Sequence, residues 1–354
     1  MPIRFIFLFL GLTISFTVFG QENTKIDIHK TSKTPFDSLF IKTFPGKFVP
    51  RLIIGLNETS VDYEKKGEKT LNYLSNNPLN IGLGIDYKWL SLEYTQSLET
   101  DPEDLDKGST KTEGFGLGLS TRKIWFKSFL QYNQGFYLEN TDEILPGFYQ
   151  RQKSFYTRPD LKTATLFTSL NYGFNTRKFS HSANLYQLEK QTKSAGSFVM
   201  GLSFALNAYQ ADSVLTPQKG AQTPYLELLK EFGLASAGLN IGYVHNFCFG
   251  KDKNWFVSLA MIPAIMYEKG EIKLGNGTIK EINGIAGFMA EGRFGFGYNS
   301  DLWFLSINSR AFSMTNDLDA EDPLSITYTS TQISYGYRFE IPKNRPGWLK
   351  KLGL

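Results

Sequence analysis

Apolar and polar residues alternate one by one over long stretches of this chain. From Leu79 to Lys88 every second residue is large and apolar, and the residues between them are Asn, Gly, Asp or Lys. The alternation recurs from Gly114 to Ser120 and, with two breaks, from Ser197 to Asn207. Successive side chains of a β-strand point to opposite faces, whereas a helix needs apolar residues three or four apart. The pattern therefore predicts strands with one apolar face and one small or polar face.

Continued along the chain, the alternation predicts about twelve strands. Most of them reach the 9–11 residues with which a tilted strand crosses a bilayer. The stretch Phe179–Gly196 is interpreted as a kinked or excursive piece, because another crossing would break the parity of the strands. The expected strands span residues 50–63, 79–88, 89–99, 112–121, 124–138, 162–174, 197–210, 232–248, 255–268, 284–298, 303–314 and 325–341.

The connections between these strands are of two kinds. Tight polar turns are expected around Lys88, at 121–123, 175–178, 250–254 and 299–301, and longer loops at 64–78, 100–111, 139–161 and 211–231. Outer-membrane barrels have short turns on the periplasmic side and long loops outside. An even strand number then places both termini in the periplasm. The predicted fold is all-β, a transmembrane antiparallel up-and-down β-barrel of about twelve strands with short periplasmic turns and longer outer loops.

Aromatic residues gather beside the tight turns. Four of the five Trp lie within two residues of such a turn. Aromatic rings prefer the headgroup level of a membrane, and barrels carry aromatic girdles there. We therefore expect an aromatic girdle made of Trp89, Trp125, Phe174, Phe249, Trp255, Phe256, Trp303 and Phe304.

Charges of both signs occur in the strands on the face opposite the apolar one. Facing lipid, each basic residue would cost about 2–4 kcal/mol near the midplane, whereas facing a hydrated lumen the charges can pair. A soluble barrel with a solvated outer face would alternate as well, and the charges alone do not exclude it. The expected lumen-facing charges are Arg51, Glu93, Lys127, Glu291, Arg293, Arg310, Arg338 and Glu340.

The amino terminus has the three parts of a secretory signal: Arg4, the apolar stretch Phe5–Phe19, and small residues Val18 and Gly20 before a polar run. We expect residues 1–20 to be a cleaved signal peptide, 21–47 a periplasmic segment, 48–341 the outer-membrane barrel and 342–354 a basic periplasmic tail. The rest of the chain contains no apolar run of about 18 residues, so no transmembrane helix is expected. The chain is rich in aromatic residues and has a single Cys, so it cannot form an internal disulfide. For an exported chain of this kind without transmembrane helices, a closed barrel is the structure that pairs every backbone group in a membrane.

Several stretches are similar to a family of outer-membrane barrels from Bacteroidota, catalogued as domain of unknown function 4421. The resemblance would cover about residues 40–341 and implies an outer-membrane barrel without catalytic residues that could be transferred. The basic tail departs from the barrels that end at an aromatic residue on their last strand. The similar stretches are Phe40–Lys47, Asn77–Lys88, Gln131–Tyr137 and Phe179–Phe198.

The sequence offers little support for catalysis or cofactor binding. A lipid hydrolase would need a His beside a Ser, and the chain has three His, at positions 29, 181 and 245. In a strand Ser180 and Ser182 would point away from His181, which leaves Ser169 or Ser203 on a neighbouring strand as partner. No cofactor motif is present, and the acidic loops at 101–106 and 317–322 are interpreted as solvated loops rather than as Ca²⁺ sites. The near-balanced net charge of +4 argues against nucleic acid as a partner.

Two functions remain open, with a weak third. The first is a pore or a transport-related barrel, indicated by the small and charged inner face. The second is a closed structural or binding barrel that acts through its outer loops. The third is a membrane lipid hydrolase that uses His181. Outer-membrane lipid, lipopolysaccharide and the barrel-assembly machinery are the expected partners, and the solute or loop-binding partner is not indicated.

Overall fold

The computed structural model describes residues 36–64, 67–76, 79–98, 106–217, 228–317 and 323–340, without the side chains of residues 283–286. The expected signal peptide and the basic tail lie outside these residues. In the described part of the chain, no helix is both long and apolar enough to cross a membrane.

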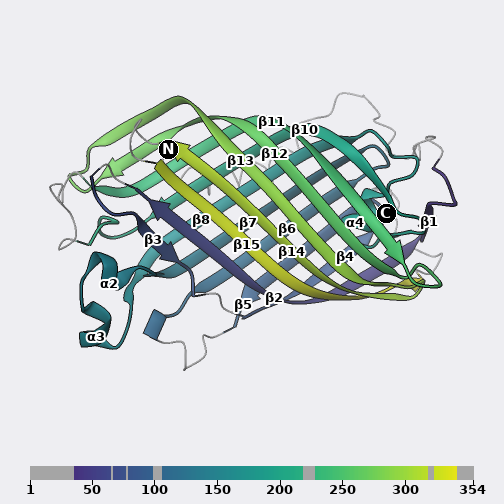
Figure 1. Cartoon of the computed structure of the whole chain (residues 1–354), viewed down its shortest axis with the longest axis horizontal. Coiled ribbons are helices and arrows are strands. Elements are labelled where there is room, and N and C mark those ends of the chain that lie inside the picture. Colours follow the sequence, from purple (N-terminus) through teal and green to yellow (C-terminus); the bar gives the residue numbers. More distant parts are fainter. Residues whose placement is uncertain are drawn as a thin grey trace, which may run out of the picture.

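Twelve antiparallel strands form one closed ring, in which the first strand pairs with the last. Figure 1 shows these strands running obliquely around the molecule. The ring confirms the predicted all-β barrel, and the twelve expected strands are all present. In ring order they are β2 (Lys47–Tyr63), β4 (Leu79–Tyr87), β5 (Leu90–Ser97), β6 (Lys111–Ser120), β7 (Ile124–Leu138), β8 (Tyr156–Gly173), β10 (Ala195–Gln210), β11 (Leu229–Phe249), β12 (Trp255–Leu274), β13 (Ile279–Asn299), β14 (Trp303–Asp317) and β15 (Pro323–Tyr337).

An apolar belt surrounds the ring, because the outward residue of each alternating pair is large and exposed. Leu239 on β11 is 69% exposed and Ile265 on β12 is 72% exposed, while Val244 and Ile262 on the inner face of these strands are 0% and 2% exposed. Water would not support such a surface, but lipid hydrocarbon does. Closure of the ring pairs the strand edges, as a bilayer requires. The chain is therefore an integral outer-membrane β-barrel.

The ring is narrower at one end than at the other. The short strand β3 (Leu71–Leu74) pairs with β2 on one side and directly with β7 on the other. Further along the ring, β4, β5 and β6 occupy the space between β2 and β7. The β5–β6 hairpin therefore widens one end of the barrel by two strands. Barrel diameter rises with strand number, so the barrel tapers toward β3.

The wide end carries four tight turns and the long β8–β10 connection, and the narrow end carries the other long loops and the tight β12–β13 turn. We call them the periplasmic and the outer end, following the habit of outer-membrane barrels. At the outer end, α2 (Thr141–Ile144) and α3 (Phe148–Gln152) lie in the loop between β7 and β8. Figure 1 shows them at the opposite end from β1 and α4. At the periplasmic end, β16 (Phe339–Glu340), the last strand of the described residues, pairs with the start of β2.

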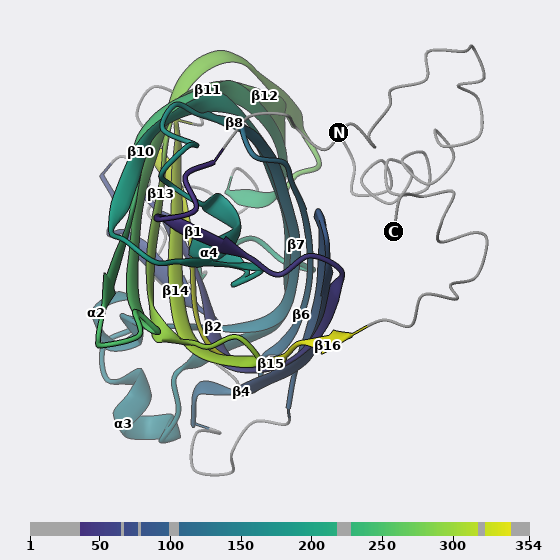
Figure 2. The same cartoon turned by 90° about the vertical axis from the view of Figure 1, so that its right-hand side faces the viewer.

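The stretch Phe179–Gly196 does not cross the membrane, which confirms its interpretation as an excursion. It forms α4 (His181–Leu185) and β9 (Glu189–Gln191), and β9 pairs with β1 (Ile41–Thr43) in a separate two-stranded sheet. Figure 2 looks along the barrel and shows β1 and α4 inside its oval ring. We call residues 36–44 and 175–194 the plug. The described part of the expected periplasmic segment thus lies in the barrel mouth.

Candidate functional site: the barrel interior

The outer end of the barrel is filled by apolar side chains. Inward residues of most strands meet residues from the connecting loops there, including Ile144 of α2 and Leu215 of the β10–β11 loop. Arg158 on β8 fixes this second loop, because its guanidinium donates to the carbonyls of Ser213 at 3.1 Å and Val214 at 2.8 Å. The hydroxyl of Tyr73 on β3 donates to the Leu215 carbonyl at 2.6 Å. An apolar core therefore closes the outer end of the barrel.

A second layer of aromatic, Met and Ala residues crosses the barrel further in. Phe129 on β7 lies 5.7 Å from Phe167 and 5.2 Å from Tyr328, measured between ring centroids. Phe312 on β14 lies 4.8 Å from Phe167 on β8. Side chains of Met266, Met289 and Met314 complete the cluster. Walls that are distant in the ring order are in contact through these side chains.

The third layer is charged, and its ion pairs span the lumen. Arg51 on β2 bonds to Asp86 on the adjacent strand at 2.6 Å and approaches Glu93 on β5 at 3.4 Å. Glu93 also accepts from Arg310 at 3.1 Å. Arg310 belongs to β14, so this bond joins strands that β15, β2 and β4 separate in the ring.

A second ion-pair group lies in the same layer. Lys127 on β7 donates to Glu291 on β13, from the opposite side of the ring. Arg293 approaches the same carboxylate at 3.5 Å. Buried ions must be paired, because an isolated charge in a poorly hydrated interior is costly. Here the pairing also fastens opposite walls to each other.

Small residues on the inner wall make room for these long side chains. A Cβ atom on Gly84 would lie 2.7 Å from the Arg51 guanidinium carbon, and one on Gly116 would lie 2.5 Å from Glu93 Cγ. A Cβ atom on Gly118 would lie 2.3 Å from the hydroxyl of Tyr186, which belongs to the plug. The glycines of β4 and β6 thus accommodate side chains instead of leaving an open channel.

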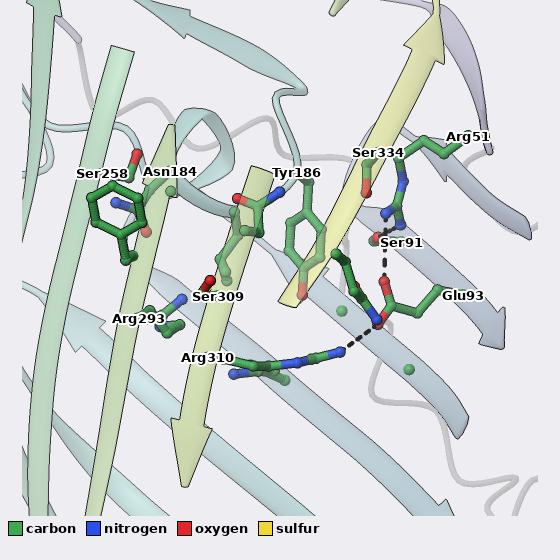
Figure 3. A pocket seen from close by; sticks show the side chains of 18 of the residues that line it. Arg51, Ser91, Glu93, Asn184, Tyr186, Ser258, Arg293, Ser309, Arg310 and Ser334 are labelled. Carbon is green, nitrogen blue, oxygen red and sulfur yellow. Dashed lines mark hydrogen bonds and ion pairs between the residues drawn. The ribbon is translucent and has the colours of Figure 1, made fainter. Parts of the chain in front are cut away.

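A small cavity remains between the charged layer and the plug. Its volume is about 70 Å³. Figure 3 shows Tyr186 reaching into it, with Arg293 and Arg310 below the tyrosine ring in that view. The walls are mixed: apolar groups such as Leu185 and Phe294 form most of the surface, and Ser91, Asn184, Ser258, Asn308 and Ser334 add polar groups. A volume of this size holds several waters or one small ion.

Side chains from turns of the barrel wall hold the plug in place. Arg122 in the β6–β7 turn binds the Glu189 carboxylate through two nitrogens, at 2.6 and 3.0 Å. Bidentate pairing fixes orientation as well as position. Two side chains of the plug bind the wall: Lys190 Nζ donates to the Asp252 carbonyl at 2.9 Å, and Lys42 pairs with Asp301 at 2.6 Å. Two side chains of the wall bind the plug: the Asn299 amide donates to the Glu189 carbonyl at 3.0 Å, and Arg338 donates to the Gln187 carbonyl.

His181 attaches α4 to the inner wall by stacking. Its ring lies 3.9 Å from that of Trp125, with an angle of 10° between the planes. Ser180 caps the helix, because its hydroxyl accepts from the Ala183 amide at 3.0 Å. Burial, assisted by the positive charges of Arg293 and Lys127, holds the pKa of His181 well below its usual value. The plug therefore docks with a neutral imidazole.

The structure places seven of the eight expected lumen charges inside the barrel. Arg338 lies at the periplasmic end, where its guanidinium is 4.1 Å from the centre of the Phe44 ring. The prediction for Glu340 is wrong, because its side chain is 86% exposed and pairs with Lys47 at 2.7 Å. The barrel wall ends at Tyr337, and Glu340 lies on β16, beyond the last inward position.

Five of the eight expected girdle residues lie at the periplasmic rim with at least part of their surface exposed: Trp89, Phe174, Phe249, Trp255 and Trp303. The ring of Tyr298 connects two of them, since it lies 5.3 Å from Trp255 and 5.0 Å from Trp303. The predictions for Trp125, Phe256 and Phe304 are wrong. These side chains are 1%, 6% and 0% exposed and point inward.

Sequence reasoning missed several residues that build this interior. Asp86 is fully buried beside Arg51, and its place on the inward side of the alternation could have revealed it. Tyr186 and Glu189 belong to the plug, where no periodic pattern signals their role. Among the described residues, no group of His, Cys, Asp and Glu could hold a metal ion.

Comparison with known families gives one match that spans the barrel. The sequence pattern of a family described as a domain of unknown function, number 4421, matches residues 35–339. No curated protein matches the chain.

Several solved structures are similar to the chain at low identity. The toluene transporter TodX from Pseudomonas putida is 11% identical over 84% of this chain and 92% of that chain, with a TM-score of 0.30. The outer membrane protease OmpT from Escherichia coli is 8% identical over 83% and 97%, with a TM-score of 0.39. An outer membrane channel from Pseudomonas putida F1 is 11% identical over 84% and 97%, with a TM-score of 0.36. These likenesses are too distant to carry an argument about function.

Proposed function

Since the chain belongs to the family of the domain of unknown function 4421, whose description assigns no activity, we propose a function from its geometry: a closed outer-membrane barrel that acts through its outer loops. The observation that carries the proposal is the filled interior. An apolar core, an aromatic layer, ion pairs across the lumen and the plug follow one another along the axis. A solute that crossed the barrel would have to displace all four of these layers.

The loop between β7 and β8 is the best candidate for contacts at the cell surface. Tyr149 of α3 is 37% exposed and packs on Phe155, with 5.0 Å between ring centroids. Its hydroxyl donates to Asp106 at 3.1 Å, and its amide donates to Asp142 at 2.9 Å. An aromatic residue held in this way, next to the exposed Arg151, is preorganised for binding. Lipopolysaccharide around the barrel is one partner that these groups could contact.

The conductance of single barrels tests the closed interior. Folded protein, identified by heat-shifted gel mobility, is inserted into a planar bilayer of defined lipid. We expect a barrel that inserts but stays electrically silent. Stable ion steps of uniform size would contradict a closed barrel and would assign the lumen a transport role.

A complementation experiment tests the outer loops. The chromosomal gene is deleted, and a barrel with residues 149–153 replaced by Gly and Ser is supplied in its place. We expect the altered barrel to fold and to leave the deletion phenotype unrepaired. A matched barrel with the outer turn at 276–278 replaced should repair it. Full repair by the first variant would exclude α3 as the functional surface.

A gated transport barrel is the second candidate, and one observation favours it. The plug has its own two-stranded sheet, separate from the strand ladder of the ring. Side chains such as Arg122 and Arg338 tie it to the wall. If the Arg122→Ala and Arg338→Ala double variant conducts while the wild type is silent, gating by the plug is supported. A silent double variant argues for permanent closure.

A lipid hydrolase at His181 has little support. The imidazole is 5% exposed and stacks on Trp125 inside the barrel, whereas a lipid substrate surrounds the outside. Ser180, its sequence neighbour, caps α4 and donates to Glu189 at 2.5 Å. We therefore infer that the barrel does not use His181 for hydrolysis. A phospholipase activity that disappears in His181→Phe, in a variant whose barrel still folds, would overturn this inference.

A further inference from the structure

Two arginines in the charged layer lie directly opposite each other. Arg293 on β13 and Arg310 on β14 are cross-strand partners, and both point inward. Like charges in this position repel and destabilise a sheet. Arg310 is compensated by Glu93 at 3.1 Å. Arg293 has no comparable partner.

The guanidinium of Arg293 is buried but incompletely bonded. Its side chain is 8% exposed, and its Nε and Nη1 atoms have no hydrogen-bond partner among the described residues. The nearest carboxylate oxygen, Glu291 Oε1, lies 3.5 Å from Nε, too poorly aligned for a hydrogen bond, and already binds Lys127. Unmade hydrogen bonds of a buried charged group are costly, so these donors require an acceptor.

The charged layer also has one positive charge in excess. Its carboxylates balance only three of its four cations. The cations are Arg51, Lys127, Arg293 and Arg310, and the carboxylates are Asp86, Glu93 and Glu291. The cavity of about 70 Å³ adjoins this layer, and Arg293 is part of its lining. Ser258 and Asn308 supply further polar groups to the same walls.

We propose that this cavity binds one small monovalent anion of the size of chloride, held by Arg293. The anion accepts from the free guanidinium donors, separates the two opposed arginines and neutralises the excess charge. A neutral Lys127 would balance the charge without an anion, but it would leave the donors of Arg293 unbonded. The proposal adds an ion site to the barrel and does not depend on what the outer loops bind.

Halide-dependent stability tests the proposal on the full-length mature barrel. The protein is refolded in detergent with sodium gluconate, whose anion is too large for the cavity, and chloride or bromide replaces gluconate at constant ionic strength. Binding to the folded state alone raises the unfolding temperature as the halide concentration rises. We expect a saturating increase of about 5 °C for the wild type. An unchanged unfolding temperature would overturn the proposal and favour a neutral Lys127.

Two variants test whether the halide-dependent increase in unfolding temperature arises at Arg293. Arg293→Met removes the proposed ligand and should abolish the halide-dependent increase, whereas Arg151→Met, on the exposed α3 helix, removes the same charge and should keep it. If Arg293→Met does not fold, bromide anomalous diffraction from the wild-type crystal provides the answer. A peak beside Arg293 supports the site. Bromide found only elsewhere, or an equal increase in Arg293→Met, would refute it.

Discussion

Glu291 is the residue on which one half of the charged layer depends. Its carboxylate binds Lys127 from the opposite wall and faces Arg293 from its own strand. All three side chains are less than a tenth exposed. Removing one partner of a buried ion pair leaves an uncompensated charge, which costs far more than the pair itself contributes.

We predict that Glu291→Gln lowers the free energy of unfolding by about 3–5 kcal/mol, because Lys127 and Arg293 then lose their shared carboxylate. Urea unfolding of the barrel in lipid vesicles, followed by gel mobility, measures the loss. Glu231→Gln is the matched control, since its pair with Lys273 is 26% and 40% exposed and should cost less than about 1 kcal/mol. Equal losses in the two variants would contradict a buried ionic layer.

His181 makes docking of the plug depend on pH. Its pKa in the docked state is lowered, so the released plug binds a proton that the docked plug cannot. The plug should be docked above about pH 6.5 and should lose stability as the pH falls below that value, by about 1.4 kcal/mol per pH unit. Hydrogen exchange of α4 between pH 7.5 and about 5 measures this. His181→Phe, which can still stack on Trp125, should remove the pH dependence; if it does not, another group is responsible.

At the scale of elements, the β5–β6 hairpin determines the shape of the barrel. Its outer end meets the point where β7 changes partner from β6 to β3. Gly135 lies in the bulge of β7 at this point, with φ of +92°, and a Cβ there would lie 2.2 Å from the Ser109 carbonyl oxygen. Thr110 donates to the Gly135 carbonyl at 2.7 Å and fastens the end of the hairpin.

Gly135→Ala should therefore destabilise the barrel by more than about 1 kcal/mol, because Ala is strained at this φ and also collides with backbone. Gly292→Ala is the control, since a Cβ there meets nothing within 4 Å. The unfolding midpoint and the hydrogen exchange of residues 106–111 report the effect. An unperturbed hairpin in Gly135→Ala would show that the bulge does not set the junction.

The ring strands were predictable from sequence, because alternation over ten or more residues leaves few other structures. The three wrong predictions for the aromatic girdle arose because the alternation of side chains along a strand was not applied to them. Trp255 and Phe256 are adjacent, so only one can face lipid, and the same holds for Trp303 and Phe304. Trp125 lies two residues from Lys127 and therefore shares its inward face.

The plug could not be predicted in the same way. Its strands have three residues each and its helix has five, which is too short for a periodic signal. Tyr186 lies against Gly118 of β6, and Glu189 binds Arg122 of the β6–β7 turn; a single sequence does not show such distant pairings. Only the disruption of the alternation between residues 179 and 196 marked the segment as different.

At the scale of the whole molecule, the apolar belt fixes the barrel in the membrane. Met261, six residues along β12 from the girdle residue Trp255, is 59% exposed, and Ile279, at the outer tip of the β12–β13 hairpin, is 61% exposed. The two residues are alike in burial but not in position. The hairpin continues well beyond the 9–11 residues that cross a bilayer, so Ile279 should lie in water.

Met261→Arg should then cost about 2–4 kcal/mol, because it lies near the midplane, and Ile279→Arg should cost close to nothing. Folding into vesicles from urea, followed by gel mobility, measures both values. Similar costs at the two positions would show that the belt extends to the outer tip or that the barrel does not insert as described.

The seam between β2 and β15 determines when the barrel can form. These strands come from the two ends of the chain, and until they meet, each leaves a row of backbone groups unpaired. Such an edge is costly in lipid and pairs indiscriminately in water. Synthesis and export of the last strand must therefore precede closure. A chain truncated before Pro323 lacks the strand that pairs with β2 and cannot close into a smaller barrel. Loss of this final segment should abolish insertion altogether, so that quality control removes the truncated protein before it reaches the membrane.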